Sequence, residues 1–160
     1  NIVITKEGLV KLIDFGLARS GGVSNQRGAS LGYAAPEFLL KLEQRAPLDC
    51  WSLATTAFEL HKGRMPISMI PDIQHNFKRY YDEGSLVKVM EEKLMPEIPR
   101  FLQFASPSLA DFILQTLQID PTTRPPASDL VRHAFVRGNS IASEADLQVL
   151  VRSLKQEIKL

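Results

Sequence analysis

The stretch Lys11-Leu12-Ile13-Asp14-Phe15-Gly16-Leu17-Ala18 decides the fold, together with Gly32-Tyr33-Ala34-Ala35-Pro36-Glu37 further along the chain. The first stretch is an apolar, β-type run that ends in a carboxylate, an aromatic ring and a glycine. Residues 20–30 lie between the two stretches, are rich in Gly and Ser, and show no apolar periodicity, which predicts an exposed loop. Pro36 indicates the start of a helix, because a proline in the first helical turn sacrifices no hydrogen bond. The sequence therefore predicts a strand, a loop and a helix in that order.

The two motifs in this order, Asp-Phe-Gly and then Ala-Pro-Glu, resemble the metal-binding and activation segment of eukaryotic-type protein kinases. Phosphoryl transfer requires hard oxygen ligands for Mg²⁺, and the resemblance implies that Asp14 supplies one of them to bound ATP and Mg²⁺. It also implies that the packing of Phe15 holds this carboxylate in place, and that Gly16 permits a sharp turn after it. Asp-Phe-Gly alone fits an ordinary strand end followed by a turn. The second motif, at a suitable distance, favours the kinase interpretation.

Two short apolar runs, 2–4 and 9–13, flank Thr5-Lys6-Glu7-Gly8 and predict a β-hairpin. In the kinase family these two strands border the metal site. Asn1 lies thirteen positions before Asp14, as in the family pattern. The resemblance therefore implies that the Asn1 amide oxygen is the second Mg²⁺ ligand. The alternative is an asparagine without a role.

The predicted loop carries hydroxyl groups whose roles follow from the same resemblance. Ser20 and Ser24 are candidate phosphorylation sites, because an added phosphate could pair with arginine and order the segment. A plain flexible loop is equally compatible with these two serines. Ser30 lies three residues before Tyr33, where serine/threonine kinases place a hydroxyl that bonds to the catalytic loop. The resemblance implies that Ser30 and Tyr33 shape the substrate-facing loop and that the substrates are Ser/Thr hydroxyls.

Three charged residues have supporting roles by resemblance. In the family, the glutamate at the position of Glu37 pairs with a distant arginine, which Arg124 matches, and a buried carboxylate needs such a partner. Two unrelated surface charges are the alternative. Asp49, at the start of a helix predicted over 47–61, would accept backbone N–H groups of the catalytic loop. A carboxylate that simply faces the helix dipole is the alternative for Asp49.

Apolar periodicity and start signals predict the remaining helices. The helix over 47–61 is closed by Gly63 and is apolar on nearly all sides, which predicts that it lies in the core. Further helices are predicted over 85–94, from 106 to about 117, from 125 to about 135, and over 143–158. The last of these carries an apolar stripe, so it either packs back on the domain or pairs with a partner helix. The sequence assigns no role to residues 64–82.

Together these elements predict an α+β fold that is mainly helical and resembles the C-terminal lobe of a protein kinase, with a short hairpin and a helical bundle. We expect a partial kinase domain over 1–136 and a C-terminal helical tail over 137–160. The sequence begins on a strand without Met, and it contains neither a G-x-G-x-x-G loop nor a His-Arg-Asp motif. We therefore expect a fragment that lacks the N-terminal lobe. This fragment would hold no catalytic base and would be inactive alone.

Composition narrows the possible function classes. The chain has 160 residues, of which 44% are hydrophobic, as expected for one domain with a core. The net charge of +1 gives no electrostatic reason to expect nucleic-acid or membrane binding. Cys50 is the single cysteine, which argues against a disulfide within the chain and against a cysteine-based metal site. We expect a cytoplasmic location, and a nuclear one is also compatible.

The favoured function is part of a protein serine/threonine kinase, which transfers the γ-phosphate of ATP to Ser/Thr hydroxyls of protein substrates. The alternative is a non-catalytic pseudokinase or a truncated scaffold that only binds partners. The presence of Asp14 and Asn1 favours the enzyme, because a pseudokinase has no need of Mg²⁺ ligands.

Overall fold

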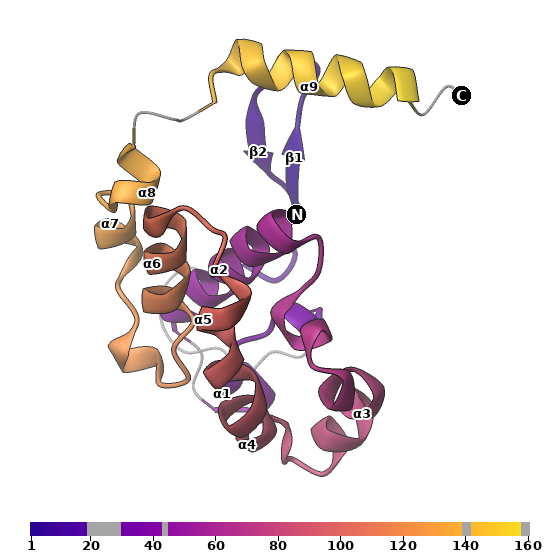
Figure 1. Cartoon of the computed structure of the whole chain (residues 1–160), viewed down its shortest axis with the longest axis vertical. Coiled ribbons are helices and arrows are strands. Elements are labelled where there is room, and N and C mark those ends of the chain that lie inside the picture. Colours follow the sequence, from indigo (N-terminus) through magenta and orange to yellow (C-terminus); the bar gives the residue numbers. More distant parts are fainter. Residues whose placement is uncertain (19–29, 43–44, 139–141, 158–160) are drawn as a thin grey trace. The chain divides into compact units, whose positions relative to one another are not determined.

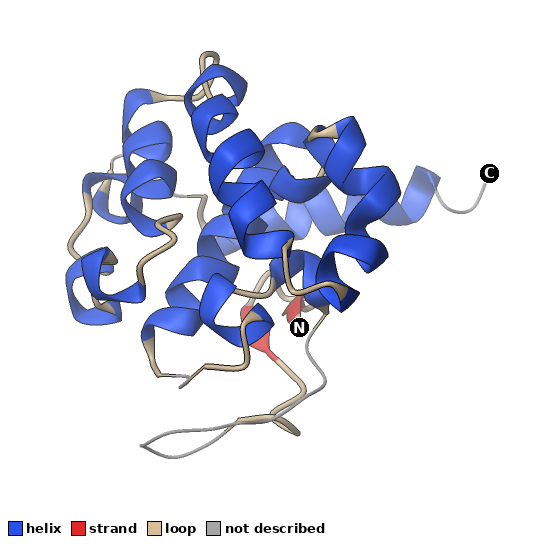
Figure 2. Cartoon of the chain, turned by 90° about the horizontal axis from the view of Figure 1, so that it is seen from below, coloured by secondary structure: helices blue, strands red, loops and turns tan. Residues whose placement is uncertain are grey.

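A computed structural model of the chain describes residues 1–18, 30–42, 45–138 and 142–157. Residues 155–157 are described by their backbone only. Most of the described chain is helical and its strands form one hairpin (Figures 1 and 2), which confirms the predicted fold class. The elements in chain order are β1 (Ile2–Ile4), β2 (Val10–Leu12), η1 (Leu31–Tyr33), α1 (Pro36–Leu39), α2 (Pro47–Lys62), η2 (Pro66–Met69), α3 (Pro71–Asp82), α4 (Leu86–Val89), η3 (Met90–Leu94), η4 (Met95–Glu97), α5 (Ile98–Phe101), α6 (Pro107–Thr116), η5 (Pro121–Thr123), α7 (Ala127–Leu130), α8 (Ala134–Arg137) and α9 (Glu144–Glu157). No helix in the described part of the chain is long and apolar enough to cross a lipid bilayer.

The chain separates into two compact units. Residues 1–20 and 137–160 form one of them, which we call the hairpin unit, and residues 21–136 form the other, the helical unit. The hairpin unit contains β1, β2 and α9, and the helical unit contains the elements from η1 to α8. The expected division of the chain was a domain over 1–136 and a tail over 137–160. The hairpin and the tail fall in the same compact unit, and the division into a partial domain and a tail stays a prediction.

The predicted β-hairpin is present. β1 and β2 are antiparallel, with Ile2 opposite Leu12 and Ile4 opposite Val10. At the turn, the Thr5 N–H donates to the carbonyl oxygen of Leu9 at 2.8 Å. A two-stranded hairpin is marginally stable by itself, so this one depends on packing against another element.

Helix α2 is the central element of the helical unit, and its ends match the sequence signals. Pro47 begins it, and Gly63 closes it with φ 71° while donating its N–H to the Glu59 carbonyl oxygen at 2.7 Å. The expectation that this helix is buried on nearly all sides is wrong, because Leu53 is 44% exposed and Leu60 is 84% exposed. Its buried face is formed by Cys50, Trp51, Ala54, Thr55 and Phe58.

Residues 64–82, to which the sequence assigns no role, form η2 and α3. Helix α3 buries Ile73 completely. Its Asp72 carboxylate accepts hydrogen bonds from the Lys93 ammonium and, at 3.1 Å, from the Tyr80 hydroxyl. The bond from Lys93 and that from Tyr80 lower the pKa of Asp72. The bond from Lys93 connects α3 to η3, whereas the bond from Tyr80 lies within α3.

The predicted helix over 85–94 is present, but its second half differs from an α-helix. It consists of α4 followed by η3, which is a π-helical turn. Leu86, Met90 and Leu94 are all buried. These residues are spaced by four positions, so they stay on the buried face even where the α-helix continues as a π-helix.

Helix α6 begins where the sequence predicts it and packs against α2 (Figure 1). The Ser106 hydroxyl accepts a hydrogen bond from the Leu109 N–H at 3.3 Å, which caps the helix. Phe112 and Ile113 are buried on its inner face. The single helix predicted from 125 to about 135 is instead two short helices, α7 and α8, separated by a turn. The helix predicted over 143–158 is present as α9.

Candidate functional site

The Glu37 carboxylate and the Arg124 guanidinium form a buried, bidentate ion pair. Nη1 donates to Oε1 at 2.7 Å and Nη2 donates to Oε2 at 2.8 Å. The exposed fractions of the side chains are 4% for Glu37 and 0% for Arg124. The N–H groups of Arg124 also donate to the carbonyl oxygens of Gln118 (2.8 Å), Ile119 (3.2 Å) and Pro47 (3.1 Å). The pair thus has the additional hydrogen bonds that buried charges require, and it joins α1, the start of α2 and the segment after α6.

Tyr33 is held on α2 by two hydrogen bonds. Its hydroxyl donates a hydrogen bond to the Glu59 carboxylate, and its carbonyl oxygen accepts one from the Ser52 hydroxyl at 3.0 Å. The bond to Glu59 raises the pKa of Tyr33, because loss of the phenol proton would place two negative charges together. Sequence reasoning missed Glu59 as the partner of Tyr33.

Ser30 lies just before η1 and is exposed. Its carbonyl oxygen accepts a hydrogen bond from the Tyr33 N–H at 2.9 Å. The structure therefore places Ser30 and Tyr33 in one turn, with the serine hydroxyl free to face solvent and the tyrosine ring fixed on α2. Ser20 and Ser24, the candidate phosphorylation sites, lie outside the described residues.

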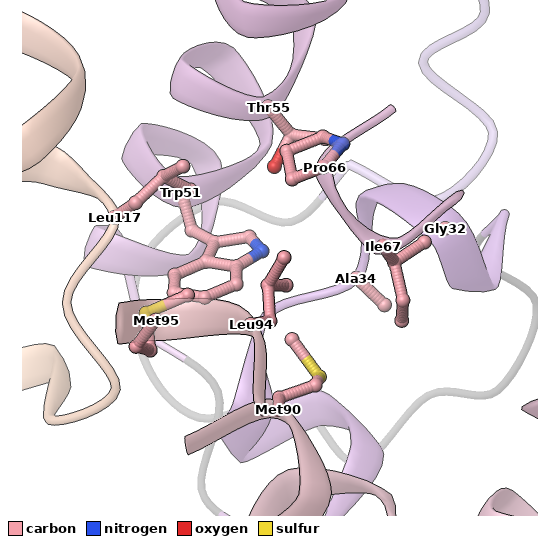
Figure 3. A pocket seen from close by; sticks show the side chains of 10 residues that line it. All are labelled: Gly32, Ala34, Trp51, Thr55, Pro66, Ile67, Met90, Leu94, Met95 and Leu117. Atoms are coloured by element: carbon pink, nitrogen blue, oxygen red, sulfur yellow. The ribbon is translucent and has the colours of Figure 1, made fainter. Parts of the chain in front are cut away.

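A small cavity lies behind the segment that carries Tyr33 (Figure 3). Its lining residues are Gly32, Ala34, Trp51, Thr55, Pro66, Ile67, Met90, Leu94, Met95 and Leu117. The volume of about 10 Å³ is at the lower limit for a single water, and the lining is mainly apolar. A Cβ on Gly32 would lie 2.5 Å from the Met65 sulfur. This segment is therefore packed tightly against the core, and the cavity is not a ligand site.

Asn1 and Asp14 lie at the open end of the hairpin. The Ile13 N–H donates to the carbonyl oxygen of Asn1 at 2.9 Å, which extends the pairing one step beyond Ile2 and Leu12. Asp14 directly follows Ile13, just after the end of β2. The structure therefore brings the two predicted Mg²⁺ ligands to the same end of one hairpin.

Asp14 has a left-handed backbone conformation, with φ 59°. This conformation is uncommon for residues other than glycine, and such strain is often found at functional sites. One carboxylate oxygen, Oδ1, accepts a hydrogen bond from the Gly16 N–H at 3.3 Å. A turn follows Asp14, as expected: it contains Gly16 and Leu17, and the Ala18 N–H donates to the Phe15 carbonyl oxygen at 2.9 Å. The positive φ falls on Asp14 and not on Gly16.

The oxygen atoms at this end suit Mg²⁺. The ion prefers oxygen ligands and is often bound by one or two carboxylates, while water and phosphate oxygens complete its octahedron. Asn1 and Asp14 are both exposed, so their side-chain oxygens are accessible. Among the described residues, no group of three or more His, Cys, Asp or Glu side chains could hold a metal alone. A Mg²⁺ ion held by Asn1 and Asp14 would therefore depend on a nucleotide for further ligands.

Two other predicted site residues, Phe15 and Asp49, are exposed. The Phe15 side chain is 66% exposed, so the described structure does not show the anchoring contact expected for it. Asp49 lies in the first turn of α2 and is exposed, where a carboxylate faces the positive end of the helix dipole. The roles of both residues stay predictions.

Comparisons with known proteins agree with this arrangement of motifs. The profile of the family described as the protein kinase domain matches residues 1–136. Cytokinesis protein sepH of Aspergillus terreus is 33% identical over 164 residues, which cover 98% of this chain and 11% of that protein. Mitogen-activated protein kinase kinase kinase 9 of Arabidopsis thaliana is 32% identical over 141 residues, covering 85% of this chain and 16% of the relative.

A third relative, mitogen-activated protein kinase kinase kinase ANP1 of Arabidopsis thaliana, is 30% identical over 168 residues, covering 100% of this chain and 23% of the relative. The chain therefore spans less than a quarter of the length of each of these three relatives. The family profile, in contrast, covers most of the chain. This chain belongs to the protein kinase domain family.

Proposed function

We propose that this chain is part of a protein serine/threonine kinase, which transfers the γ-phosphate of ATP to Ser/Thr hydroxyls of protein substrates. The observation that carries the proposal is the position of Asn1 and Asp14 at the same open end of the hairpin, joined by the Ile13 N–H bond to the Asn1 carbonyl oxygen. In a chain of the protein kinase family, this is where Mg²⁺ ligands are expected.

Within this function, each predicted residue has a physical task. Asn1 and Asp14 hold Mg²⁺, which neutralises the developing negative charge on the phosphates when it is bound. Tyr33, fixed by Glu59 and Ser52, gives the substrate-facing turn a defined place on α2. Glu37 and Arg124 keep the start of α1 attached to the segment after α6.

The proposal includes further parts that rest on the family resemblance, on the low net charge and on the apolar stripe of α9. ATP and Mg²⁺ are the cofactors, proteins are the substrates, and neither nucleic acid nor a membrane is a partner. Phosphorylation at Ser20 or Ser24 regulates the loop that contains these serines. Helix α9 contacts a partner or another part of the protein.

The protein is located in the cytoplasm, with the nucleus as the alternative. Imaging of a tagged protein at its native level distinguishes the two.

The test uses the full-length protein, with Asp14→Ala as the variant and Glu91→Gln as the control. Glu91 is an exposed carboxylate of η3 without a role in the site. Transfer of labelled phosphate from ATP to a protein substrate should fall at least about a hundredfold in Asp14→Ala, because the charge neutralisation is lost. Glu91→Gln should stay within twofold of the wild type. Equal transfer by the wild type and Asp14→Ala would reject the kinase in favour of a binding scaffold.

A further inference from the structure

The turn of the hairpin lies against the first turns of α9, within the hairpin unit (Figure 1). The Gln148 side-chain amide donates a hydrogen bond to the Glu7 carbonyl oxygen at 2.8 Å. Gly8, next in the turn, is buried, whereas most of the hairpin is exposed. The turn is thus the part of the hairpin that another element covers.

This contact requires glycine at position 8. A Cβ atom on Gly8 would lie 2.2 Å from the Glu144 carbonyl oxygen and 3.0 Å from the Glu144 carbonyl carbon. Both are backbone atoms, so they cannot move aside as a flexible side chain could. Gly8 also has φ 79°, which other residues rarely adopt. Backbone therefore packs directly on backbone at this point.

The start of α9 is fixed by its own capping bonds, which define where the Glu144 carbonyl lies. The Ser143 N–H donates to Asp146 Oδ2 at 2.8 Å, and the Asp146 N–H donates to the Ser143 hydroxyl at 3.2 Å. This reciprocal arrangement is that of a capping box. The helix thus presents a rigid surface to the turn.

The hairpin is short enough that its two ends move together. At the turn, the Thr5 hydroxyl accepts hydrogen bonds from the N–H groups of Glu7 and Leu9, both at 3.3 Å. At the open end, the Ile13 N–H donates to the Asn1 carbonyl oxygen. Each strand has three residues, and a hairpin of this size is marginal in water without packing. The described contacts that could supply this packing come from α9.

We propose that α9 is a positioning element for the metal-binding end of the hairpin, and that Gly8 and Gln148 make the contact. Docking of α9 holds the register in which Asn1 and Asp14 lie at one end, and release of α9 loosens it. This inference rests on the proposed function for the role of Asn1 and Asp14. The family profile ends at residue 136, so α9 lies outside the part of the chain that the family defines.

The test measures two properties of the full-length protein: hydrogen exchange of the Ile13 amide, and binding of Mn²⁺ in the presence of ATP, followed by paramagnetic relaxation. The variants are Gly8→Ala and Gln148→Ala. The matched control is Gly84→Ala, because Gly84 has a similar φ of 69° but no atom within 4 Å of its added Cβ. Gln148→Lys retains a donor for the Glu7 carbonyl oxygen and should preserve the wild-type values.

We expect Ile13 exchange to rise about tenfold in Gln148→Ala, as for the loss of one hydrogen bond, and more in Gly8→Ala. Mn²⁺ affinity should fall in parallel, and Gly84→Ala should change neither. Unchanged Ile13 exchange in both variants overturns the inference, and so does faster exchange with unchanged Mn²⁺ affinity. If the wild type binds no Mn²⁺, the proposed metal site itself fails. Exchange at Ile13 then still reports whether α9 holds the hairpin.

Discussion

The Arg124 guanidinium bonds both carboxylate oxygens of Glu37, at 2.7 and 2.8 Å, across 87 positions of sequence. Both side chains are buried, and the guanidinium also lies 5.1 Å from the centre of the Trp51 ring. The pair therefore links three segments of the helical unit through one fully occupied group. Its loss should be felt by the whole unit.

Removing either partner should destabilise the helical unit strongly. Arg124→Ala and Glu37→Ala should each lower the free energy of unfolding by about 3–5 kcal/mol, because each leaves an unpaired buried charge. Arg124→Lys should also destabilise it, since an ammonium cannot make the two parallel bonds. Urea unfolding followed by circular dichroism provides the measurement. Arg100→Ala removes an exposed pair with Glu97 and should change stability by less than about 0.5 kcal/mol.

Loss of the Tyr33 hydroxyl should loosen the turn that contains Ser30 and Tyr33. Tyr33→Phe should cost about 1 kcal/mol, because one hydrogen bond to Glu59 is lost while the bond from Ser52 remains. The pKa of Tyr33 is raised, because its protonated hydroxyl bonds to Glu59. The stabilisation of the fold by this bond is therefore fully present below about pH 10 and is lost as the pH rises through the raised pKa. Absorbance of tyrosinate at alkaline pH measures this titration. A wild-type alkaline stability profile identical to that of Tyr33→Phe would contradict the prediction.

The exposed leucines of α2 should tolerate polar substitution in the isolated chain. Leu60 is 84% exposed, so Leu60→Gln should alter the free energy of unfolding by less than about 0.5 kcal/mol. Phe58, two residues earlier, is fully buried, and Phe58→Ala should cost about 3–5 kcal/mol. Light scattering should show that Leu60→Gln also reduces self-association, because it removes apolar surface. A large loss of stability in Leu60→Gln would mean that Leu60 is covered in solution.

Acid should weaken the start of α9. Hydrogen bonds from the Ser143 hydroxyl and from the Ser143 N–H lower the pKa of Asp146. Their stabilising effect is therefore present above the ordinary Asp value of about 3.9 and is lost as the pH falls through the lowered value. Amide exchange in residues 143–148 at decreasing pH measures this effect. Asp146→Ala should show fast exchange already at neutral pH and little further change in acid.

Local signals explain how much of the fold could be predicted. Pro47 at the first position of α2 and Gly63 at its end fix that helix within a residue of the expectation, because capping depends on nearby residues only. The hairpin could be predicted because two apolar runs flank a Gly-containing turn, whereas its register is known only from the structure. The exposure of Leu60 could not be predicted in this way, because periodicity shows which residues share a face but not what covers that face.

For the candidate site too, local motifs could predict some residues and not others. The resemblance to kinases pointed to Asn1, Asp14, Glu37 and Arg124, since motif spacing is written directly in the chain. It did not point to Glu59 as the partner of Tyr33, because a hydrogen bond across 26 positions has no sequence period. It placed a turn at Gly16, where the structure has one, but it gave no sign that Asp14 just before it takes a positive φ.

By itself, the sequence determined the family, the order of the helices and the residue types available to Mg²⁺, because these depend on motifs and on local backbone preferences. Only the tertiary structure decided that α9 packs on the hairpin turn, that Glu59 holds Tyr33, and that one face of α2 is left exposed. These features depend on which distant segments meet, and that choice is made by shape and hydrogen-bond geometry rather than by any pattern along the chain.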